Sequence, residues 1–231
     1  MGIAENIAQV RANIARAAQE AGRDPAEITL VGASKMNDAA ACRAAIAAGI
    51  DSLGENRVQE MTQKLAEHAY DGAPLHFIGH LQRNKAKLVV GRVDVIESVG
   101  SLELLRLIDA LAEKAGVVQD ILLEVNIGGE DAKSGFAPEA LAEAAEEARS
   151  LPHVRLRGLM CIPPVAEDSH GSIPYFEKVH ALYVDINEKL YHNRLDMLSM
   201  GMSGDYEDAV RTGATIVRVG TAIFGTRDYA K

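Results

Sequence analysis

Short apolar runs alternate with amphipathic stretches along almost the whole chain. Residues 3–21 form the first amphipathic stretch, where Ile7, Val10, Ile14 and Ala17 recur at the spacing of one helix face. Beyond it, apolar runs predict β-strands at residues 29–34, 52–54, 75–79, 95–99, 121–127, 157–162, 197–200 and 216–219. Between the runs, helices are expected at residues 38–48, 58–69, 85–90, 102–115, 138–150, 173–189 and 206–212.

This alternation of strands and helices indicates an α/β fold. Several runs are continuously apolar, as parallel strands are when both faces of the sheet are covered. About eight strand–helix units in one chain predict a single TIM (β/α)8 barrel with an extra N-terminal helix, one domain over residues 1–231. A doubly wound open sheet is the alternative. Its dinucleotide-binding form is rejected, because residues 219–222 contain one glycine, Gly220, before Gly225.

Composition narrows the classes of function. The formal net charge is −9 and no basic stripe is present, so nucleic acid and anionic membranes are not expected partners. No apolar run approaches the roughly 20 residues of a membrane span, and the N-terminus lacks a secretory signal. Two cysteines, Cys42 and Cys161, make neither a disulfide framework nor a metal site. We expect a cytoplasmic protein with reduced thiols and no metal.

Lys35 ends the first apolar run, directly before an alanine-rich helical stretch. In a (β/α) barrel, chemistry gathers at the carboxyl ends of the strands. Desolvation at such a position disfavours the ammonium form, and a neutral amine attacks aldehydes. A lysine that simply reaches solvent is the alternative.

The loops after the seventh and eighth runs have the composition of a phosphate site. Ser203 and Gly204 lie in the first loop, and Gly220 and Thr221 lie in the second. Glycines let backbone amides converge, and hydroxyls add donors. The helix expected to begin near Tyr206 would add unpaired amides at its N-terminus. Ordinary turns are the alternative, but these loops are where phosphate binds in such barrels.

An amine opposite a phosphate cradle implies a ligand that carries both an aldehyde and a phosphate. Pyridoxal 5'-phosphate (PLP) fits, and so does a phosphorylated sugar, although an aldolase-type lysine usually lies later in the barrel. Arg218 lies within the last apolar run and could donate to the pyridine nitrogen. Because guanidinium stays charged, it would keep that nitrogen unprotonated and weaken the ring as an electron sink. The alternative is an arginine that points outward to a carboxylate.

Seven segments carry a family resemblance, in order from the first strand to the C-terminus. They are residues 31–35, 54–60, 76–85, 133–136, 157–160, 198–203 and 217–225. With these segments the chain resembles the pyridoxal phosphate homeostasis (YggS/PROSC) family, relatives of the N-terminal barrel of alanine racemase. The resemblance implies that Lys35 carries PLP as a Schiff base and that Arg218 faces the ring nitrogen. It also implies that Ser203, Gly220 and Thr221 hold the phosphate.

The resemblance adds three residues near the cofactor. Asn56 is similar to a pocket residue near the ring, and Met200 and Met202 lie beside the cofactor in the family pattern. The chain departs from the pattern at residues 36–38, where relatives often have threonine, lysine and a nearby proline. Asp38 still suits a helix N-cap, so the site is expected to be intact.

The resemblance implies a non-catalytic protein of intracellular PLP homeostasis that stores, buffers or delivers the cofactor, with apo PLP-dependent enzymes as candidate partners. The alternative is a racemase-like enzyme, which needs acid–base groups on both faces of the cofactor. Alanine racemase takes the second group, a tyrosine, from a separate domain of a partner chain. The last expected strand ends shortly before Lys231, which leaves little chain for that domain. We therefore expect a monomeric binding protein.

Four other polar residues are not assigned to the site. His76 and His80 lack a third metal ligand, so packing or a place on the rim is expected. Glu55 is expected to be a buried carboxylate bonded to backbone amides. Lys133 could approach the phosphate or lie in a solvated loop, and the role of His80 at the pocket mouth stays open.

Overall fold

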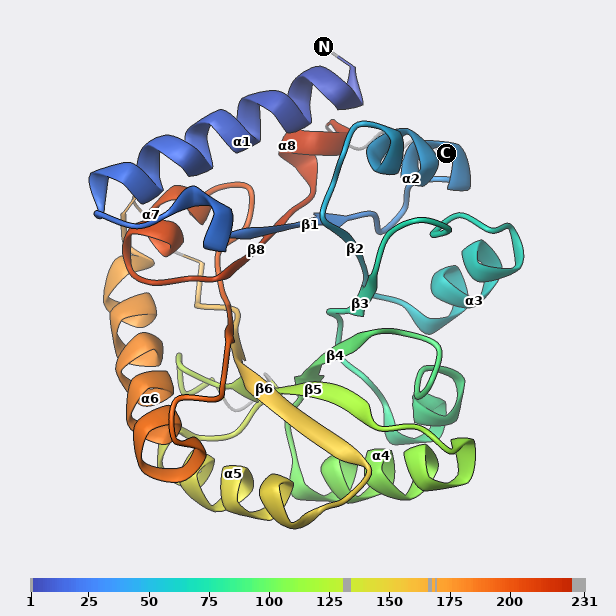
Figure 1. The fold of residues 1–231 in the computed structure, drawn as a ribbon, viewed down its shortest axis with the longest axis vertical. Coiled ribbons are helices and arrows are strands. Elements are labelled where there is room, and N and C mark those ends of the chain that lie inside the picture. Colours follow the sequence, from blue (N-terminus) through green and yellow to red (C-terminus); the bar gives the residue numbers. More distant parts are fainter. Residues whose placement is uncertain (1, 131–133, 166–167, 169, 226–231) are drawn as a thin grey trace.

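Eight parallel strands close into a barrel in the order of the sequence, so that β8 pairs with β1. The computed structural model describes residues 2–130, 134–165, 168 and 170–225. Viewed down the barrel, the strands form an inner ring and the helices surround it (Figure 1). The strands are β1 (Thr29–Ala33), β2 (Ser52–Glu55), β3 (Leu75–Phe77), β4 (Val95–Val99), β5 (Gln119–Val125), β6 (Val154–Cys161), β7 (Met197–Ser199) and β8 (Ile216–Val219).

The helices follow the strands, apart from one that precedes them all. They are α1 (Ile3–Glu20), α2 (Ala39–Ala47), α3 (Val58–Ala66), α4 (Leu102–Ala115), α5 (Leu141–Ser150), α6 (Ile173–Tyr191), α7 (Tyr206–Arg211) and α8 (Thr221–Phe224). Helix α1 packs against α2, α7 and α8, and so covers the seam where β8 meets β1 (Figure 1). The predicted barrel with an additional N-terminal helix is confirmed. Within the described residues, no helix is both long and apolar enough to traverse a bilayer.

Side-chain caps fix where several helices begin. The Asp38 carboxylate accepts a hydrogen bond from the amide of Ala41 at 2.8 Å, and α2 starts there. The Ser101 hydroxyl accepts from the amide of Leu104 at 3.2 Å at the start of α4. Such caps satisfy amides that have no partner within the helix. The departure from the family pattern at residues 36–38 therefore leaves the start of α2 intact.

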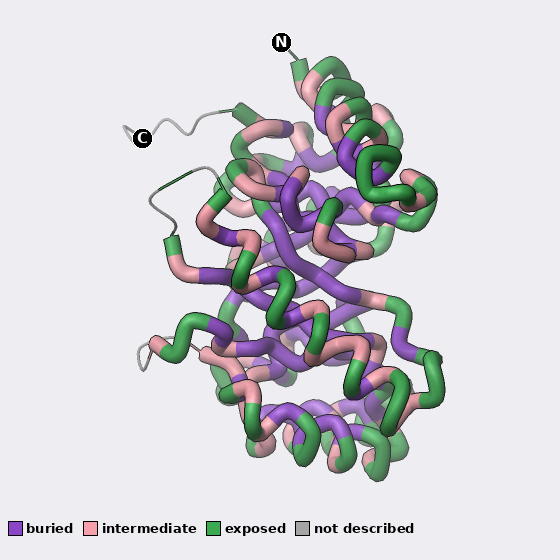
Figure 2. Tube along the Cα trace, turned by 90° about the vertical axis from the view of Figure 1, so that its left-hand side faces the viewer, coloured by how far each residue is buried: buried purple, intermediate pink, exposed green. Residues whose placement is uncertain are grey.

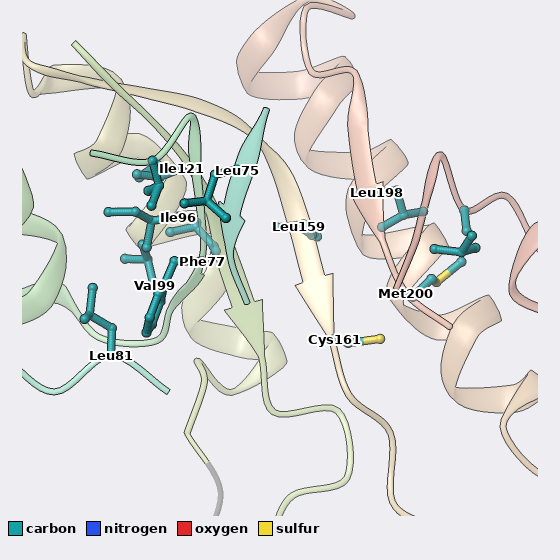
Figure 3. Close-up of a cluster of buried hydrophobic side chains, with 14 of the residues drawn as sticks. Leu75, Phe77, Leu81, Ile96, Val99, Ile121, Leu159, Cys161, Leu198 and Met200 are labelled. Atoms are coloured by element: carbon teal, nitrogen blue, oxygen red, sulfur yellow. The ribbon is translucent and has the colours of Figure 1, made fainter. Parts of the chain in front are cut away.

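The hydrophobic core has two layers, because successive side chains of a strand point to opposite faces. A large layer lies between the strands and the helices, and Figure 3 shows Phe77, Ile96 and Val99 within it. A small cluster of Val95, Leu122 and Met160 lies apart from that layer. Figure 2 shows that the strands inside the molecule are buried and that the exposed positions lie on the outer faces of the helices.

Strand β6 begins three residues before the predicted start at residue 157. Arg155 and Arg157 alternate with apolar residues there, and both donate to the carboxylate of Asp120, at 2.6 and 2.5 Å. The prediction was wrong at this end because charged residues in the sequence suggest a loop. Their partner lies on the neighbouring strand, and the sequence alone does not reveal that pairing.

Two predicted helices are partly 3-10 turns. Residues 85–90 fall largely in the 3-10 turn Arg83–Leu88, whose one buried residue is Ala86. An isolated short segment with so small an apolar face gains little from packing, and 3-10 turns are common connectors. The predicted helix at 138–150 opens as the 3-10 turn Pro138–Ala140 and becomes α5 only at Leu141.

Candidate functional site

A cavity of about 470 Å³ lies at the carboxyl ends of the strands. That volume falls within the range of small-molecule sites, and this end of a (β/α) barrel is where such sites occur. The residues that line it are Asn56, Ile78, Gly79, His80, Glu124, Val125, Asn126, Ser134 and Ile162. Of the predicted site residues Asn56 lies in this lining, and His80 lies at the cavity as well.

Lys35 follows β1, which pairs with β2 on one side and β8 on the other. The Ser34 hydroxyl points outward and donates to Glu55 at 2.6 Å. The next residue, Lys35, is half-buried and lies in the turn that follows β1. Lys35 therefore lies between the strand end that carries Asn56 and the strand end that carries Gly220.

Arg218 lies inside the barrel and is 3% exposed. Its guanidinium donates to the carbonyl oxygen of Cys161 at 2.8 Å and to the Ser199 hydroxyl, and it lies 3.7 Å from the Glu97 carboxylate. The alternative of an outward-pointing arginine is wrong. These partners fix the guanidinium in the interior, on the strand that leads to Gly220.

Glu97 provides the negative charge that balances Arg218. It is fully buried, 2.6 Å from Nδ1 of His76, and accepts a hydrogen bond from Ser199 at 2.6 Å. Burial raises the pKa of Glu97, but hydrogen bonds with His76 and Ser199 and the charge of Arg218 outweigh burial and hold the pKa below its usual value. Glu97 is therefore a carboxylate. His76 is the partner of Glu97 in this network. No cluster suited to a metal ion occurs among the described residues.

The two predicted phosphate loops meet at Ser203. Its hydroxyl oxygen accepts from the amides of Gly220 and Ala222, at 3.2 and 3.3 Å. Because that oxygen is the acceptor of both bonds, the hydroxyl proton remains for an acceptor such as a phosphate oxygen. Thr221 lies between the two residues that donate these amides, at the start of α8. The structure brings Ser203, Gly220 and Thr221 together as the sequence predicts.

The α7 N-terminus has fewer unpaired amides than the sequence predicts. The amides of Asp205 and Tyr206 both donate to the carbonyl oxygen of Met202, at 3.1 and 2.9 Å. The Asp205 carboxylate accepts in turn from the Met202 amide at 2.7 Å. This closed turn uses the amides of Met202, Asp205 and Tyr206, and it adds a negative charge at the start of α7. The contribution of the remaining first-turn amides to phosphate binding stays a prediction.

The residues at this end of the barrel fit PLP. Oδ1 of Asn56 is buried without a hydrogen-bond partner in the described structure, although Asn56 lines the cavity. A buried polar atom of this kind is costly unless a ligand or water satisfies it. A Cβ on Gly79 would lie 2.2 Å from the Asn56 carbonyl oxygen, so glycine permits the close approach that places Asn56 there. With Lys35 and the Ser203 loop, the site offers an amine, a polar acceptor and donors for an anion.

Glu124 is a site residue that the sequence reasoning missed. It lies within β5 and lines the cavity, whereas the residues predicted from the sequence at this position follow the strand. Its carboxylate accepts from the Ser134 hydroxyl at 2.9 Å. Burial raises the pKa of Glu124, opposed by Ser134 and by the charges of His80 and Arg218. An acidic residue inside an apolar strand was the available signal.

Met200 and Met202 take different places. Met200 is fully buried in the outer hydrophobic layer near Leu198 (Figure 3), and Met202 is 38% exposed in the loop that follows. The structure gives Met200 a packing position, and its contact with a cofactor stays a prediction. Lys133 lies outside the described residues. Glu55 bonds to side chains and not to backbone amides, which corrects the expectation for its carboxylate.

A second cavity, of about 530 Å³, lies at the opposite end of the barrel. Its aspartates already have protein partners: Asp51 and Asp94 accept from the amides of Leu30 and Leu75, each at 2.7 Å. Asp120 is bound by arginines. These carboxylates connect neighbouring strands, so the acidic residues at this end of the barrel are explained by their role in the fold.

Comparison with known proteins agrees with this geometry. A family model described as alanine racemase, N-terminal domain, matches residues 6–228. The chain is 44% identical over 227 residues to a pyridoxal phosphate homeostasis protein of Pseudomonas aeruginosa, covering 98% of this chain and 96% of the relative. This chain belongs to the pyridoxal phosphate homeostasis protein family.

Solved structures place this family member among similar barrels. The structure of PipY from Synechococcus elongatus, with PLP bound, is 34% identical with a TM-score of 0.83, over 96% of this chain and 100% of PipY. An alanine racemase of Clostridium difficile shares the fold, with a TM-score of 0.72 at 18% identity. The match covers 94% of this chain but 56% of the racemase chain.

Proposed function

We propose that this chain binds PLP at the carboxyl end of its barrel and serves intracellular PLP homeostasis by storing, buffering or delivering the cofactor. One observation carries the proposal: Lys35 and the Ser203–Gly220 cradle follow neighbouring strands at the same end of the barrel as the cavity. The PLP found in PipY and the names of the curated relatives support it.

Six of the predicted residues have a task in this proposal. Lys35 binds the cofactor covalently as a Schiff base, and Ser203, Gly220 and Thr221 hold the phosphate. Arg218 donates to the ring nitrogen, and Asn56 borders the ring. When bound, PLP supplies an electrophilic carbon to amines and a ring that can delocalise charge.

Arg218 supports a non-catalytic role. A guanidinium does not give up a proton near neutral pH, and the Glu97 carboxylate stabilises its charge further. A ring nitrogen that accepts from Arg218 stays unprotonated, so the ring withdraws electrons weakly. The chain therefore holds PLP in a form suited to binding and release.

The racemase-like function is the second candidate. Two observations favour it: Glu124 and His80 both line the cavity, and either could move a proton. Against it, none of the tyrosines in the described part of the chain lines this cavity. The PLP-loaded protein in deuterated water with L-alanine should show negligible exchange of the α-proton by NMR. Exchange at enzyme rates, about 1–10³ per second, would establish the second function.

Reduction with borohydride tests the proposed attachment. Wild-type protein mixed with PLP should gain a visible absorption band, and peptide mapping after reduction should find the cofactor mass on Lys35. Lys35→Ala should lose both signals. Lys189→Ala removes an exposed lysine of α6 and should keep both signals. Equal labelling of Lys35→Ala and wild type would refute the attachment site.

Two finer points belong to the same proposal. Cys42 and Cys161 are free and buried, which suits a reducing compartment, and we place the protein in the cytoplasm.

Apo PLP-dependent enzymes are the proposed recipients of the cofactor. The transfer is measured by adding loaded protein to such an apoenzyme and following its recovered activity, with free PLP at the same concentration as the reference.

A further inference from the structure

Helix α3 contacts the backbone on both sides of Lys35. The Glu60 carboxylate accepts a hydrogen bond from the Met36 amide at 2.7 Å. Nζ of Lys64 donates to the carbonyl oxygen of Ser34 at 2.8 Å. Glu60 and Lys64 are four residues apart, so they lie one turn apart on the same face of α3. One helix face thus holds the peptide groups that precede and follow Lys35.

Lys64 is held in turn by Glu55. The two charges lie 2.6 Å apart, with Lys64 5% exposed and Glu55 fully buried. Glu55 also accepts from the hydroxyls of Ser34, at 2.6 Å, and Tyr70, at 3.0 Å. All three of these groups bond to Oε1 of Glu55, while Oε2 is buried without a hydrogen-bond partner in the described part of the chain. A buried ion pair of this kind adds little net stability compared with apolar packing, so its bonds serve to hold the geometry around Ser34.

The chain at Met36 adopts a conformation that needs such support. Its φ of 62° is left-handed, which is uncommon for residues other than glycine. A residue held there persists only when its surroundings determine it. The bond from the Met36 amide to Glu60 fixes this turn, and the bond from Asn37 to the Lys35 carbonyl oxygen, at 3.1 Å, closes it.

We propose that Glu55, Glu60 and Lys64 form a clamp that positions Lys35 for attachment to PLP. The clamp rests on the proposed function of Lys35, and its residues lie on the outer side of the strand, away from the cavity. Fixing the backbone at the root of the lysine restricts where its amine can reach. The neutral amine is then held near the aldehyde carbon, with which it forms a C=N bond as the aldehyde oxygen leaves in one molecule of water. The clamp also gives a role to Glu55 and Glu60 of the segment 54–60, whose Asn56 faces the cavity.

Substitutions at Glu60 test the clamp without disturbing a buried charge. Glu60→Ala removes the acceptor of the Met36 amide, and Glu60→Gln restores an uncharged acceptor. Gln59→Ala changes an exposed neighbour on the same helix and is the matched control. In PLP-free protein, Glu60→Ala should speed hydrogen exchange of the Met36 amide about tenfold or more. The control should match wild type, and Glu60→Gln should recover most of the protection.

The same variants are then mixed with PLP, and attachment is followed by absorbance. Glu60→Ala should attach PLP about tenfold more slowly than the control. Glu60→Gln should attach it at nearly the wild-type rate. A role in stability alone would not give this pattern, because the rates are compared on fully folded protein, checked by circular dichroism.

The buried pair is tested by removing both charges together. Glu55→Gln with Lys64→Met avoids an isolated buried charge and should also slow attachment about tenfold. If this protein does not fold, the Glu60 variants decide alone. Glu60→Ala with wild-type exchange and attachment, while Lys35→Ala loses attachment, would overturn the clamp and leave the proposed function standing. Wild-type protein that attaches no PLP at Lys35 would overturn both.

Discussion

Two glutamates inside the barrel show how surroundings set the state of one residue type. Glu97 is met by His76, Ser199 and Arg218, and its pKa lies below the usual value. Glu124 lies in the cavity with the Ser134 hydroxyl as its hydrogen-bond donor, and burial raises its pKa. Glu97 therefore stabilises the fold as an anion. For Glu124, ionisation lowers the stability of the folded protein.

Glu97→Gln should destabilise the protein at neutral pH by about 3–5 kcal/mol, because it leaves the buried Arg218 charge uncompensated. The folded pKa lies below the model-peptide value of 4.5. The contribution of Glu97 is therefore present above that pH and disappears as the pH falls through the folded pKa. Urea unfolding of variant and wild type from pH 7 downward measures the gap, which should narrow below pH 4.5. A gap that does not change with pH would contradict this.

Glu124→Gln should show the opposite dependence. The folded pKa lies above 4.5, so ionisation in the folded state costs stability as the pH rises through it. At low pH the variant should equal wild type, and at pH 7 it should be more stable than wild type. The same unfolding series measures both variants. An advantage for wild type that grows with pH would show that Glu124 is stabilised as an anion.

At the scale of elements, one close approach joins β6 to β7. A Cβ on Gly158 would lie 1.6 Å from the carbonyl oxygen of Met197, and the pairing register shifts nearby, between Ile121 and Leu122. Glycine lets the strands approach where this irregularity occurs. The sequence contains the glycine, but only the pairing of the strands explains it.

Gly158→Ala should destabilise the protein by about 3 kcal/mol or more, because the new methyl group meets backbone and not a flexible side chain. The free energy of unfolding measured in urea is the test. Gly204→Ala is the matched control for stability, since nothing lies within 4 Å of its added Cβ. Equal free energies for the two variants would show that β6 and β7 can separate at little cost.

Some elements could be predicted from the sequence and others could not, for physical reasons. Helix α1 was predicted because Ile7, Val10 and Ile14 repeat at helical spacing, and all are buried. The start of β6 was missed because Arg155 depends on Asp120 of another strand. A local sequence pattern predicts an element that packs through its own apolar residues. An element stabilised by charges from a distant part of the chain can be recognised only in the tertiary structure.

At the scale of the whole molecule, exposed large apolar side chains gather around the site. Among the described residues, Met36, Ile162, Val165 and Met202 lie in loops at the carboxyl ends of strands, and Val118 lies elsewhere. Isolated apolar residues are normal on a surface, whereas permanent interfaces need large contiguous patches. Outside the site, the described surface shows no such group of large apolar side chains.

We therefore expect a monomer. Light scattering coupled to size-exclusion chromatography should give the mass of one chain, 24.7 kDa, over a range of protein concentrations. The mass should be the same with and without PLP. A doubled mass that persists on dilution would show that a second copy covers part of this surface.

The sequence by itself determined the order of strands and helices, the barrel, and the loops in which Lys35, Ser203 and Gly220 lie. These follow from the periodicity of nearby residues and from the rule that chemistry collects at one end of such a barrel. Only the tertiary structure decided that Arg218 points inward, that Glu124 faces the cavity and that α3 holds the backbone at Lys35. Each of these depends on partners distant in the chain, as Ser199 and Glu97 are, and such pairs exist only once the barrel has closed.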